Sequence, residues 1–347
     1  MSILTTVGKP AASFRASIRV VQEREMKAIQ ISEIGGPEVL KWAEVPVPTP
    51  GPDEVLIKVA AAGVNFIEIY FREGRYKAPL PLIPGSEASG TVEKLGQGVE
   101  GFAVGDPVAS AGVRGSYAEY ALVPAAQLVK VPAGLDLKLA AAAMLQGMTA
   151  HYLAFSTWVL EPGETALIHA GAGGVGLLLT QIAKACGARV LTTVSTQEKA
   201  ELSRTAGADE VILYTEFDFE AEVKRLTEGR GVDVVYDSVG KTTFEKSLNC
   251  LRPRGLLALF GGSSGAVPPF DLIQLSQRGS LFVTRPTLKD YTATRAELEE
   301  RAGTILKWVA EGTLKVRAEH DYALAEAAQA QIDIASRKTT GKLLLIP

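Results

Sequence analysis

The sequence has little of the chemistry that thiol and metal sites require. Its 347 residues include two cysteines, Cys186 and Cys250, and three histidines, His151, His169 and His320. No histidine lies at ligand spacing from a cysteine and no two cysteines are close together, so the pattern excludes a catalytic zinc and a Cys–His nucleophile. Both cysteines lie in apolar helical patterns, which is typical of buried thiols in a reducing compartment.

The sequence also lacks an excess of positive charge and any long apolar run, and both absences limit the classes of binding partner. The formal net charge is -3, with 36 Lys and Arg against 39 Asp and Glu, so there is no basic footprint and we expect no nucleic-acid partner. No apolar run reaches the length that spans a bilayer, so we expect no membrane span. Neither a P-loop nor a G-x-S-x-G elbow is present.

Acidic residues are missing from the start of the chain. Residues 1–25, "MSILTTVGKPAASFRASIRVVQERE", have no acid before Glu23, and this is the composition of a transit peptide. A disordered extension, or a start codon placed too early, would explain residues 1–25 equally well, because Met26 opens a strand-like run, "MKAIQI". We expect a cytoplasmic protein, or a mitochondrial one if 1–25 is a transit peptide.

The rest of the chain divides into three parts that differ in their pattern of apolar and turn-forming residues. Residues 26–146 are short apolar runs separated by Gly and Pro, as in a small β-barrel-like domain. Residues 147–284 alternate apolar strands with helices, which predicts a parallel, doubly wound sheet. Residues 285–347 contain one amphipathic helix, roughly 294–311, and end in "GKLLLIP", a strand expected to rejoin the first domain.

Within 147–284 the pattern predicts six strands. They are "TALIHA", "RVLTTV", "EVILY", "VDVVYDS", "GLLALFG" and "LFVT". The clearest helical patterns between them cover 176–186 and 246–251. His169 ends the first of these strands, where a hydrogen-bonded core histidine is a better interpretation than a catalytic base.

Gly171, Gly173 and Gly176 fit the spacing G-x-G-x-x-G between a strand and a helix. Such glycines let the chain turn tightly and approach a pyrophosphate, which the helix N-terminus then binds with its free N–H groups and partial positive charge. A plain strand-to-helix turn is the alternative. In this context the turn indicates a dinucleotide site.

The acid that usually holds the ribose about 20 residues after such a turn is missing. The next strand ends "RVLTTVSTQEK", where Ser195 and Glu198 have the spacing of a capping box and Lys199 follows in the first helical turn. A cation there opposes the helix dipole unless a 2′-phosphate binds it. The absence of the ribose-binding acid therefore favours NADPH as the cofactor, although Lys199 could also be a solvated surface lysine.

Several segments carry a family resemblance that covers nearly all of residues 26–347. They are "GGPEVL", "GVNFIEIYFREGRY", "HAGAGGVG", "VVYDSVG", "FGGSSGAV" and "VTRP". In them the chain resembles the zinc-free medium-chain dehydrogenase/reductases, and specifically the NADPH:quinone oxidoreductases of the ζ-crystallin type. Zinc alcohol dehydrogenases of this superfamily have a ligand Cys where this chain has Asn65, and a ligand His where it has Ser86.

The resemblance implies an α/β protein with a GroES-like β-barrel catalytic domain, 26–146 with 285–347 returning to it, and a Rossmann NADPH-binding domain, 147–284. It implies that Asn65, Phe66 and Tyr70 border the nicotinamide end, and of these we choose Asn65 and Tyr70 as the catalytic hydrogen-bond donors to the acceptor. The cofactor contacts implied by the turn and by the resemblance together are Phe66, Tyr76, Tyr152, Gly171, Gly173, Gly174, Val175, Gly176, Ser195, Lys199, Tyr214, Ser238, Ser263, Ser264, Phe282, Thr284 and Arg337. Without the resemblance, Asn65 with Glu68 would be only a helix cap, and Tyr70 and Tyr76 only packing aromatics.

We therefore predict reduction of quinones by NADPH without a metal, in a homodimer that pairs through the strand at 280–284. An NADPH-dependent enone or enal reductase, which adds hydride to a carbon–carbon double bond, is the alternative. A less favoured alternative is an NADPH-binding structural or RNA-binding protein. The sequence does not distinguish transfer of single electrons from transfer of hydride.

Overall fold

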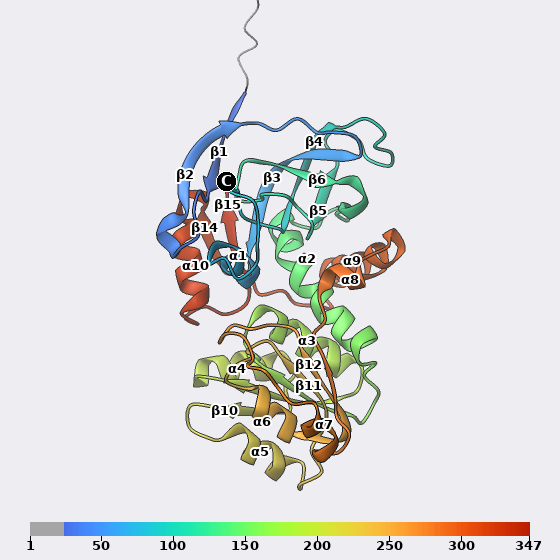
Figure 1. The fold of residues 1–347 in the computed structure, drawn as a ribbon. Coiled ribbons are helices and arrows are strands. Elements are labelled where there is room, and N and C mark those ends of the chain that lie inside the picture. The colour runs from blue at the N-terminus through green and yellow to red at the C-terminus, as the bar shows by residue number, and fades with distance from the viewer. Residues whose placement is uncertain (1–23) are drawn as a thin grey trace, which may run out of the picture.

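A computed structural model describes residues 24–347 and shows two lobes, one β-rich and one of alternating strands and helices (Figure 1). The transit-peptide prediction rests on residues before 24, so it lies outside the described residues. The first strand, β1, begins at Glu25, one residue before the predicted start. In the described range no helix is long and apolar enough to cross a membrane.

The β-rich lobe contains two sheets. β1 (Glu25–Gln30) pairs with β2 (Lys41–Pro46), and the larger sheet has the order β14-β15-β3-β4-β5-β7, with β6 also on β3. Its strands are β3 (Glu54–Val64), β4 (Ala88–Leu95), β5 (Pro107–Ser110), β6 (Tyr120–Pro124), β7 (Val129–Lys130), β14 (His320–Ala323) and β15 (Leu343–Ile346). Aliphatic side chains from alternate strand positions fill its core, Ile57 and Val64 among them.

The end of the chain returns to this lobe, as predicted. β15 pairs antiparallel with β3, with Leu343 opposite Val64. The helix before it, α10 (Ala327–Ala335), packs beside α1 (Phe66–Arg72), so both ends of the sequence build one lobe (Figure 1). The junction of β3 and α1 therefore lies next to the C-terminal strand, although the two are nearly 280 residues apart along the chain.

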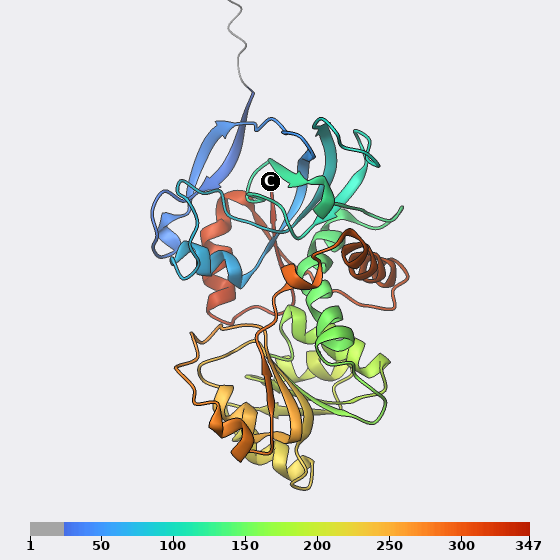
Figure 2. The ribbon, with the colours of Figure 1, turned by 45° about the vertical axis from the view of Figure 1, so that its right-hand side comes forward.

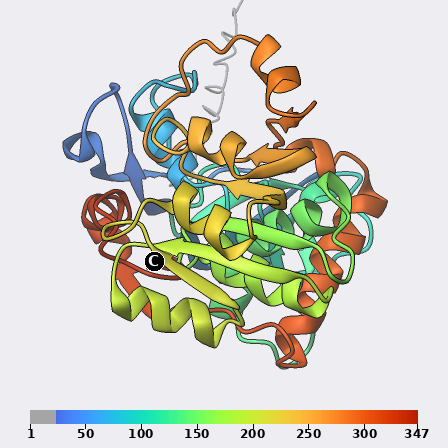
Figure 3. The ribbon, with the colours of Figure 1, turned by 90° about the horizontal axis from the view of Figure 1, so that it is seen from below.

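The second lobe is built on a parallel sheet of order β10-β9-β8-β11-β12-β13, and this confirms the doubly wound prediction. Its strands are β8 (Thr165–His169), β9 (Arg189–Val194), β10 (Glu210–Leu213), β11 (Val232–Asp237), β12 (Leu251–Leu259) and β13 (Phe282–Thr284). Its helices are α3 (Gly174–Ala185), α4 (Gln197–Thr205), α5 (Phe219–Leu226), α6 (Phe244–Asn249) and α7 (Ile273–Gln277). They lie on both faces of the sheet (Figure 3).

One helix prediction needs correction. The pattern predicted a helix over 246–251, but α6 covers Phe244–Asn249 and Leu251 already belongs to β12, opposite Val232. The helix starts earlier because Asp237, at the end of β11, accepts a hydrogen bond from Thr243 Oγ1 at 2.7 Å and holds the chain there. It ends earlier because Leu251 is needed in the sheet.

Helix α2 (Leu137–Tyr152) joins the lobes (Figure 2). Its N-cap is Asp136, whose carboxylate accepts from the Lys138 backbone N–H at 2.7 Å. It packs against β3 in one lobe and α3 in the other, and also against α9 (Arg295–Ala310), the amphipathic helix predicted over 294–311. A π-helical turn (Leu153–Thr157) follows α2, and α8 (Leu288–Tyr291) precedes α9.

Candidate functional site

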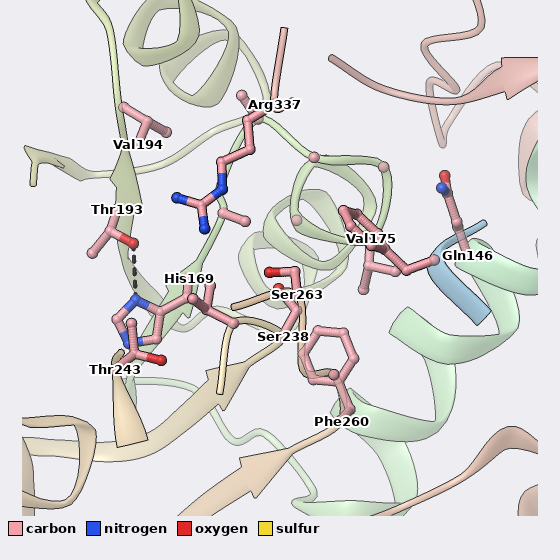
Figure 4. Close-up of a pocket in the computed structure, with 18 of the residues that line it drawn as sticks. Gln146, His169, Val175, Thr193, Val194, Ser238, Thr243, Phe260, Ser263 and Arg337 are labelled. Atoms are coloured by element: carbon pink, nitrogen blue, oxygen red, sulfur yellow. Dashed lines mark hydrogen bonds between the residues drawn. The ribbon is translucent and has the colours of Figure 1, made fainter. Parts of the chain in front are cut away.

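A cavity of about 1050 Å³ runs between the two lobes. Its walls come from α1 and α2, from the glycine turn before α3, from the loops after the parallel strands, and from the segment before β15. In Figure 4 the Arg337 guanidinium reaches in on the side of Thr193 and His169, while Gln146 and Val175 lie at the opposite side. The cavity is therefore at the carboxyl edge of the parallel strands, where open α/β sheets bind their ligands.

The glycine turn has the geometry that binds a diphosphate. Gly173 is the extended N-cap of α3, and the first bond inside the helix runs from Leu177 N to Gly173 O at 2.9 Å. The N–H groups of residues 174–176 therefore face out of the helix end, and all three residues line the cavity. A Cβ on Gly176 would lie 2.3 Å from Ala170 O, so the turn can close only with glycine there.

The structure corrects the capping box predicted for Ser195 and Glu198. The N-cap of α4 is Thr196, whose hydroxyl accepts from Lys199 N at 3.3 Å. Ser195 lies between the end of β9 at Val194 and the Thr196 cap, and its carbonyl accepts from Thr215 Oγ1 at 3.0 Å. The Ser195 hydroxyl is thereby left on the cavity wall instead of being used in a helix cap.

One cation, Lys199, contacts this hydroxyl, and a second, Arg337, lines the same cavity. Lys199 Nζ donates to Ser195 Oγ at 3.3 Å and to Arg337 O at 2.6 Å, so the lysine links the second lobe to the segment before β15. Arg337 has φ 59°, and its side chain lines the same end of the cavity as Tyr214. Lys199 and Arg337 therefore bring two positively charged side chains to the cavity wall, where an anionic ligand could accept hydrogen bonds from them.

Fifteen of the nineteen predicted site residues line this one cavity. They are Asn65, Phe66, Tyr70, Tyr76, Tyr152, Gly173, Gly174, Val175, Gly176, Ser195, Lys199, Tyr214, Ser238, Ser263 and Arg337. Ser238 and Ser263 follow β11 and β12 and lie together at the sheet edge (Figure 4).

The other four, Gly171, Ser264, Phe282 and Thr284, lie outside the lining. Gly171 serves packing, because a Cβ there would be 2.6 Å from Thr192 Cβ. Ser264 joins the loops after β12 and β11 by donating to Val239 O at 2.7 Å. Phe282 and Thr284 belong to β13, the edge strand, and the Phe282 side chain is 57% exposed.

Aromatic side chains surround the other end of the cavity. The rings of Phe66 and Tyr70 are 6.5 Å apart, and Tyr76 meets Tyr70 edge-on at 5.5 Å. Burial raises the pKa of Tyr70, so its hydroxyl stays a hydrogen-bond donor across the neutral range. Tyr152 is buried and stacks on Tyr291 at 4.2 Å.

Asn65 sits at this aromatic end and is held by buried charges. Its Nδ2 donates to Glu87 Oε2 at 3.0 Å, and its Oδ1 accepts from Lys342 Nζ at 2.6 Å. Asn65 is the N-cap of α1 in a capping box with Glu68, whose Oε2 accepts from Asn65 N at 2.8 Å. Burial raises the pKa of Glu68 to about 7, against the opposing effects of Ser86 and Lys342.

Several lining residues were not predicted. Gln146 and Thr149 are polar residues in an otherwise apolar stretch of α2, and that contrast could have identified them. Arg285 adds a cation near Tyr70 and Tyr152, and it was visible in the quoted motif "VTRP". Thr193, whose hydroxyl lies 2.9 Å from His169 Nδ1, had no signal in the sequence.

His169 is a core residue with both ring nitrogens in hydrogen bonds, as expected. Its Nε2 lies 3.0 Å from Ser247 Oγ, which in turn donates to Asp237 Oδ2 at 3.0 Å. Over residues 24–347, no group of three or more His, Cys, Asp or Glu side chains is placed to hold a metal ion.

Comparison with known proteins identifies the family. Residues 51–133 match the alcohol dehydrogenase GroES-like domain, which confirms the barrel prediction, and residues 174–304 match the zinc-binding dehydrogenase family. A quinone oxidoreductase of Pseudomonas aeruginosa is 47% identical, over 92% of this chain and 99% of its own. A 2-haloacrylate reductase of a Burkholderia species is 43% identical, over 92% of this chain and 98% of its own.

Solved structures agree with the sequence comparison. The crystal structure of Escherichia coli quinone oxidoreductase complexed with NADPH superimposes with a TM-score of 0.89 at 42% identity, covering 92% of this chain and all of that one. The chain therefore belongs to the quinone oxidoreductase family of the medium-chain dehydrogenases/reductases.

Proposed function

We propose that the protein reduces quinones with NADPH. One observation carries the proposal: a single cavity joins a diphosphate-binding turn and two cations to an aromatic end with hydrogen-bond donors. Its relatives support the same function, since the Pseudomonas aeruginosa and Escherichia coli proteins are named quinone oxidoreductases and the latter was solved with NADPH.

The fit of NADPH rests on features of this chain. The turn at 173–176 would hold the diphosphate, and Ser195, Lys199, Tyr214 and Arg337 would surround the 2′-phosphate. Val175, Ser238 and Ser263 would line the path between them and the aromatic end. When bound, the nicotinamide supplies the reducing equivalents, and the protein contributes orientation and exclusion of water.

At the acceptor end, Tyr70 and Asn65 would donate hydrogen bonds to the oxygen on which negative charge develops. Tyr70 is the freer of the two. Asn65 Nδ2 already donates to Glu87, and its second hydrogen has only the carbonyl of Gly63 at 3.5 Å, a long contact, so one N–H remains for an acceptor. Phe66, Tyr76 and Tyr152 would provide the apolar surface against which the rings pack.

An alkene reductase is the second candidate, because a 2-haloacrylate reductase is among the similar proteins. The same cofactor site would serve it, with hydride going to a carbon–carbon double bond. The product distinguishes the two: a hydroquinone in one case and a saturated acid or carbonyl compound in the other.

We further infer the organisation around this site. The chain divides into a catalytic GroES-like domain, 26–146 with 285–347, and a Rossmann domain, 147–284.

We infer a homodimer through β13, where Phe282 and Val283 are 57% and 38% exposed on an edge strand that lacks a second neighbour in the described chain. The protein would be cytoplasmic, zinc-independent and without a nucleic-acid partner.

The test is a panel of quinones and activated alkenes, followed by NADPH absorbance and product analysis, on purified protein with and without a chelator. We expect turnover of 1,4-benzoquinone that survives chelation. Turnover of alkenes but not of quinones would favour the second candidate. Tightly bound zinc in the purified protein, together with an activity that the chelator abolishes, would contradict both. Light scattering of the same sample tests the dimer.

A further inference from the structure

Lys342 is a fully buried lysine beside the cavity, placed by the last turn of the chain before β15. Its side chain and that of Glu87 are both 0% exposed, and the two form an ion pair. Lys342 Nζ also donates to Asn65 Oδ1 at 2.6 Å. Asn65 lines the cavity but Lys342 does not, so the hydrogen bond to Asn65 is the direct route by which the lysine can act on a bound acceptor.

The ion pair is built into the backbone of the catalytic lobe. A Cβ on Gly63 would lie 2.0 Å from Glu87 Oε2 and 2.8 Å from Lys342 Cε, so the pair rests directly on the glycine in β3. Glu87 Oε1 accepts from Leu145 N at 2.6 Å, within α2. The next residue of α2, Gln146, packs against Gly174 of the diphosphate turn. The ion pair therefore contacts β3, which leads to Asn65, and also α2, which reaches the diphosphate turn.

The chemistry of the partners determines which way the Asn65 amide faces. An ammonium can only donate, so the atom 2.6 Å from Lys342 must be the amide oxygen. A carboxylate can only accept, so the atom 3.0 Å from Glu87 must be the amide nitrogen. Rotating the amide by half a turn would put donor against donor and acceptor against acceptor. The two charges together therefore hold the remaining Asn65 N–H in one direction.

We propose that Lys342 is a positioning residue for acceptor reduction: with Glu87 it locks the Asn65 carboxamide so that one N–H faces the acceptor. The proposal rests on the proposed function, in which Asn65 donates to the acceptor. It concerns the transition state more than the binding of either substrate, because a freely rotating amide can still contact a bound ligand but is not held ready for developing charge.

The experiment uses the full-length protein and three variants: Lys342→Met with Glu87→Gln, Asn65→Ala, and all three changes together. The paired change removes both buried charges at once, so no uncompensated charge is left in the fold. Lys338→Met, an exposed lysine in the same segment, is the control. The readouts are kcat and KM for 1,4-benzoquinone, the Kd for NADPH by fluorescence titration, and the thermal unfolding midpoint.

The paired variant should lose tenfold or more in kcat, with KM and the NADPH Kd within about threefold of wild type. Combining it with Asn65→Ala should cost little beyond Asn65→Ala alone, because the lysine acts through that amide. Wild-type kcat in the paired variant, or losses that multiply in the triple variant, would overturn the proposal. So would a rise in the NADPH Kd that matches the loss in rate.

Failure of the proposed function is recognisable separately. If the wild type reduces 2-chloroacrylate and not benzoquinone, the function assigned above is wrong. The same cycle is then run on 2-chloroacrylate, where non-additivity between the paired change and Asn65→Ala still supports the positioning role, and additivity still contradicts it.

Discussion

One lysine, Lys199, lines the cavity and another, Lys342, lies behind Asn65 at the other end, and the two are held in opposite ways. Lys199 is partly exposed, and its ammonium contacts two neutral oxygens, Ser195 Oγ and Arg337 O. Lys342 is fully buried and is paired with the Glu87 carboxylate. A cation whose partners are neutral can still attract an anionic ligand, whereas a buried and neutralised cation can only organise the protein around it.

A short segment, 337–342, links the two lysines. Lys199 holds its first carbonyl and Lys342 is its last residue, while between them Gly341 N donates to Ala172 O at 3.2 Å, beside the glycine turn. The segment thus connects the end of the cavity at Lys199 to the aromatic end at Asn65. The comparison shows how burial and the charge of the partner separate a lysine available to a ligand from one that is committed to the fold.

The largest effect should come from breaking the buried pair on one side. Glu87→Gln leaves Lys342 charged, buried and without its counter-ion, so we expect a loss of about 3–5 kcal/mol in unfolding free energy. Urea unfolding followed by circular dichroism measures it. Asp218→Asn is the matched control, because its ion pair with Lys246 has both side chains nearly half exposed and should leave the midpoint unchanged. Similar midpoints for both variants would mean that burial does not separate the two kinds of pair.

A second effect concerns Glu68, the other carboxyl beside Asn65. Burial raises its pKa from 4.5 to about 7 in the folded protein, so between these values the folded state binds more protons than the unfolded state. Stability from this group is therefore present at low pH and is lost as pH rises through 7, by up to about 3 kcal/mol. Glu68→Gln should remove that slope. Unfolding curves of both proteins at acidic, neutral and mildly alkaline pH test this, and parallel pH dependences would contradict it.

Substitutions at the Lys199 end of the cavity should give a smaller effect, which changes only the preference between NADPH and NADH. We expect the wild type to prefer NADPH to NADH at least tenfold in kcat/KM, since a charge-assisted contact contributes about 1.5–3 kcal/mol. Lys199→Ala should lose most of that preference by weakening NADPH alone, and Ser195→Asp should favour NADH by repelling the phosphate. The ratio of kcat/KM values at one ionic strength is the measurement. Equal use of both cofactors by the wild type would show that the cations serve the protein and not the phosphate.

The smallest effect is expected at Tyr70. Tyr70→Phe removes one neutral hydrogen bond to the acceptor, worth about 0.5–1.5 kcal/mol, so kcat should fall about twofold to tenfold. The NADPH Kd should change less than kcat, because the hydroxyl is assigned to charge that develops during reduction. An unchanged kcat with a raised NADPH Kd would make Tyr70 a packing residue of the cofactor site.

Local pattern alone determined much of this protein. The spacing of Gly171, Gly173 and Gly176 between a strand and a helix predicted the turn, because those constraints act over a few residues. The alternation of apolar strands with helices predicted the parallel sheet, and the scarcity of Cys and His removed the usual zinc ligands. The errors were also local: the helix at 246–251 was misplaced, and the cap of α4 belongs to Thr196 and not to Ser195.

Only the tertiary structure decided what lies behind the site. Asn65 follows β3, Glu87 precedes β4 and Lys342 precedes β15, and the three meet because β15 pairs with β3 beside β4. No local pattern marks Lys342 as buried, since a lysine before a short apolar strand is ordinarily solvated. Its role follows from burial and from one carboxylate within reach, and both are properties of the folded chain.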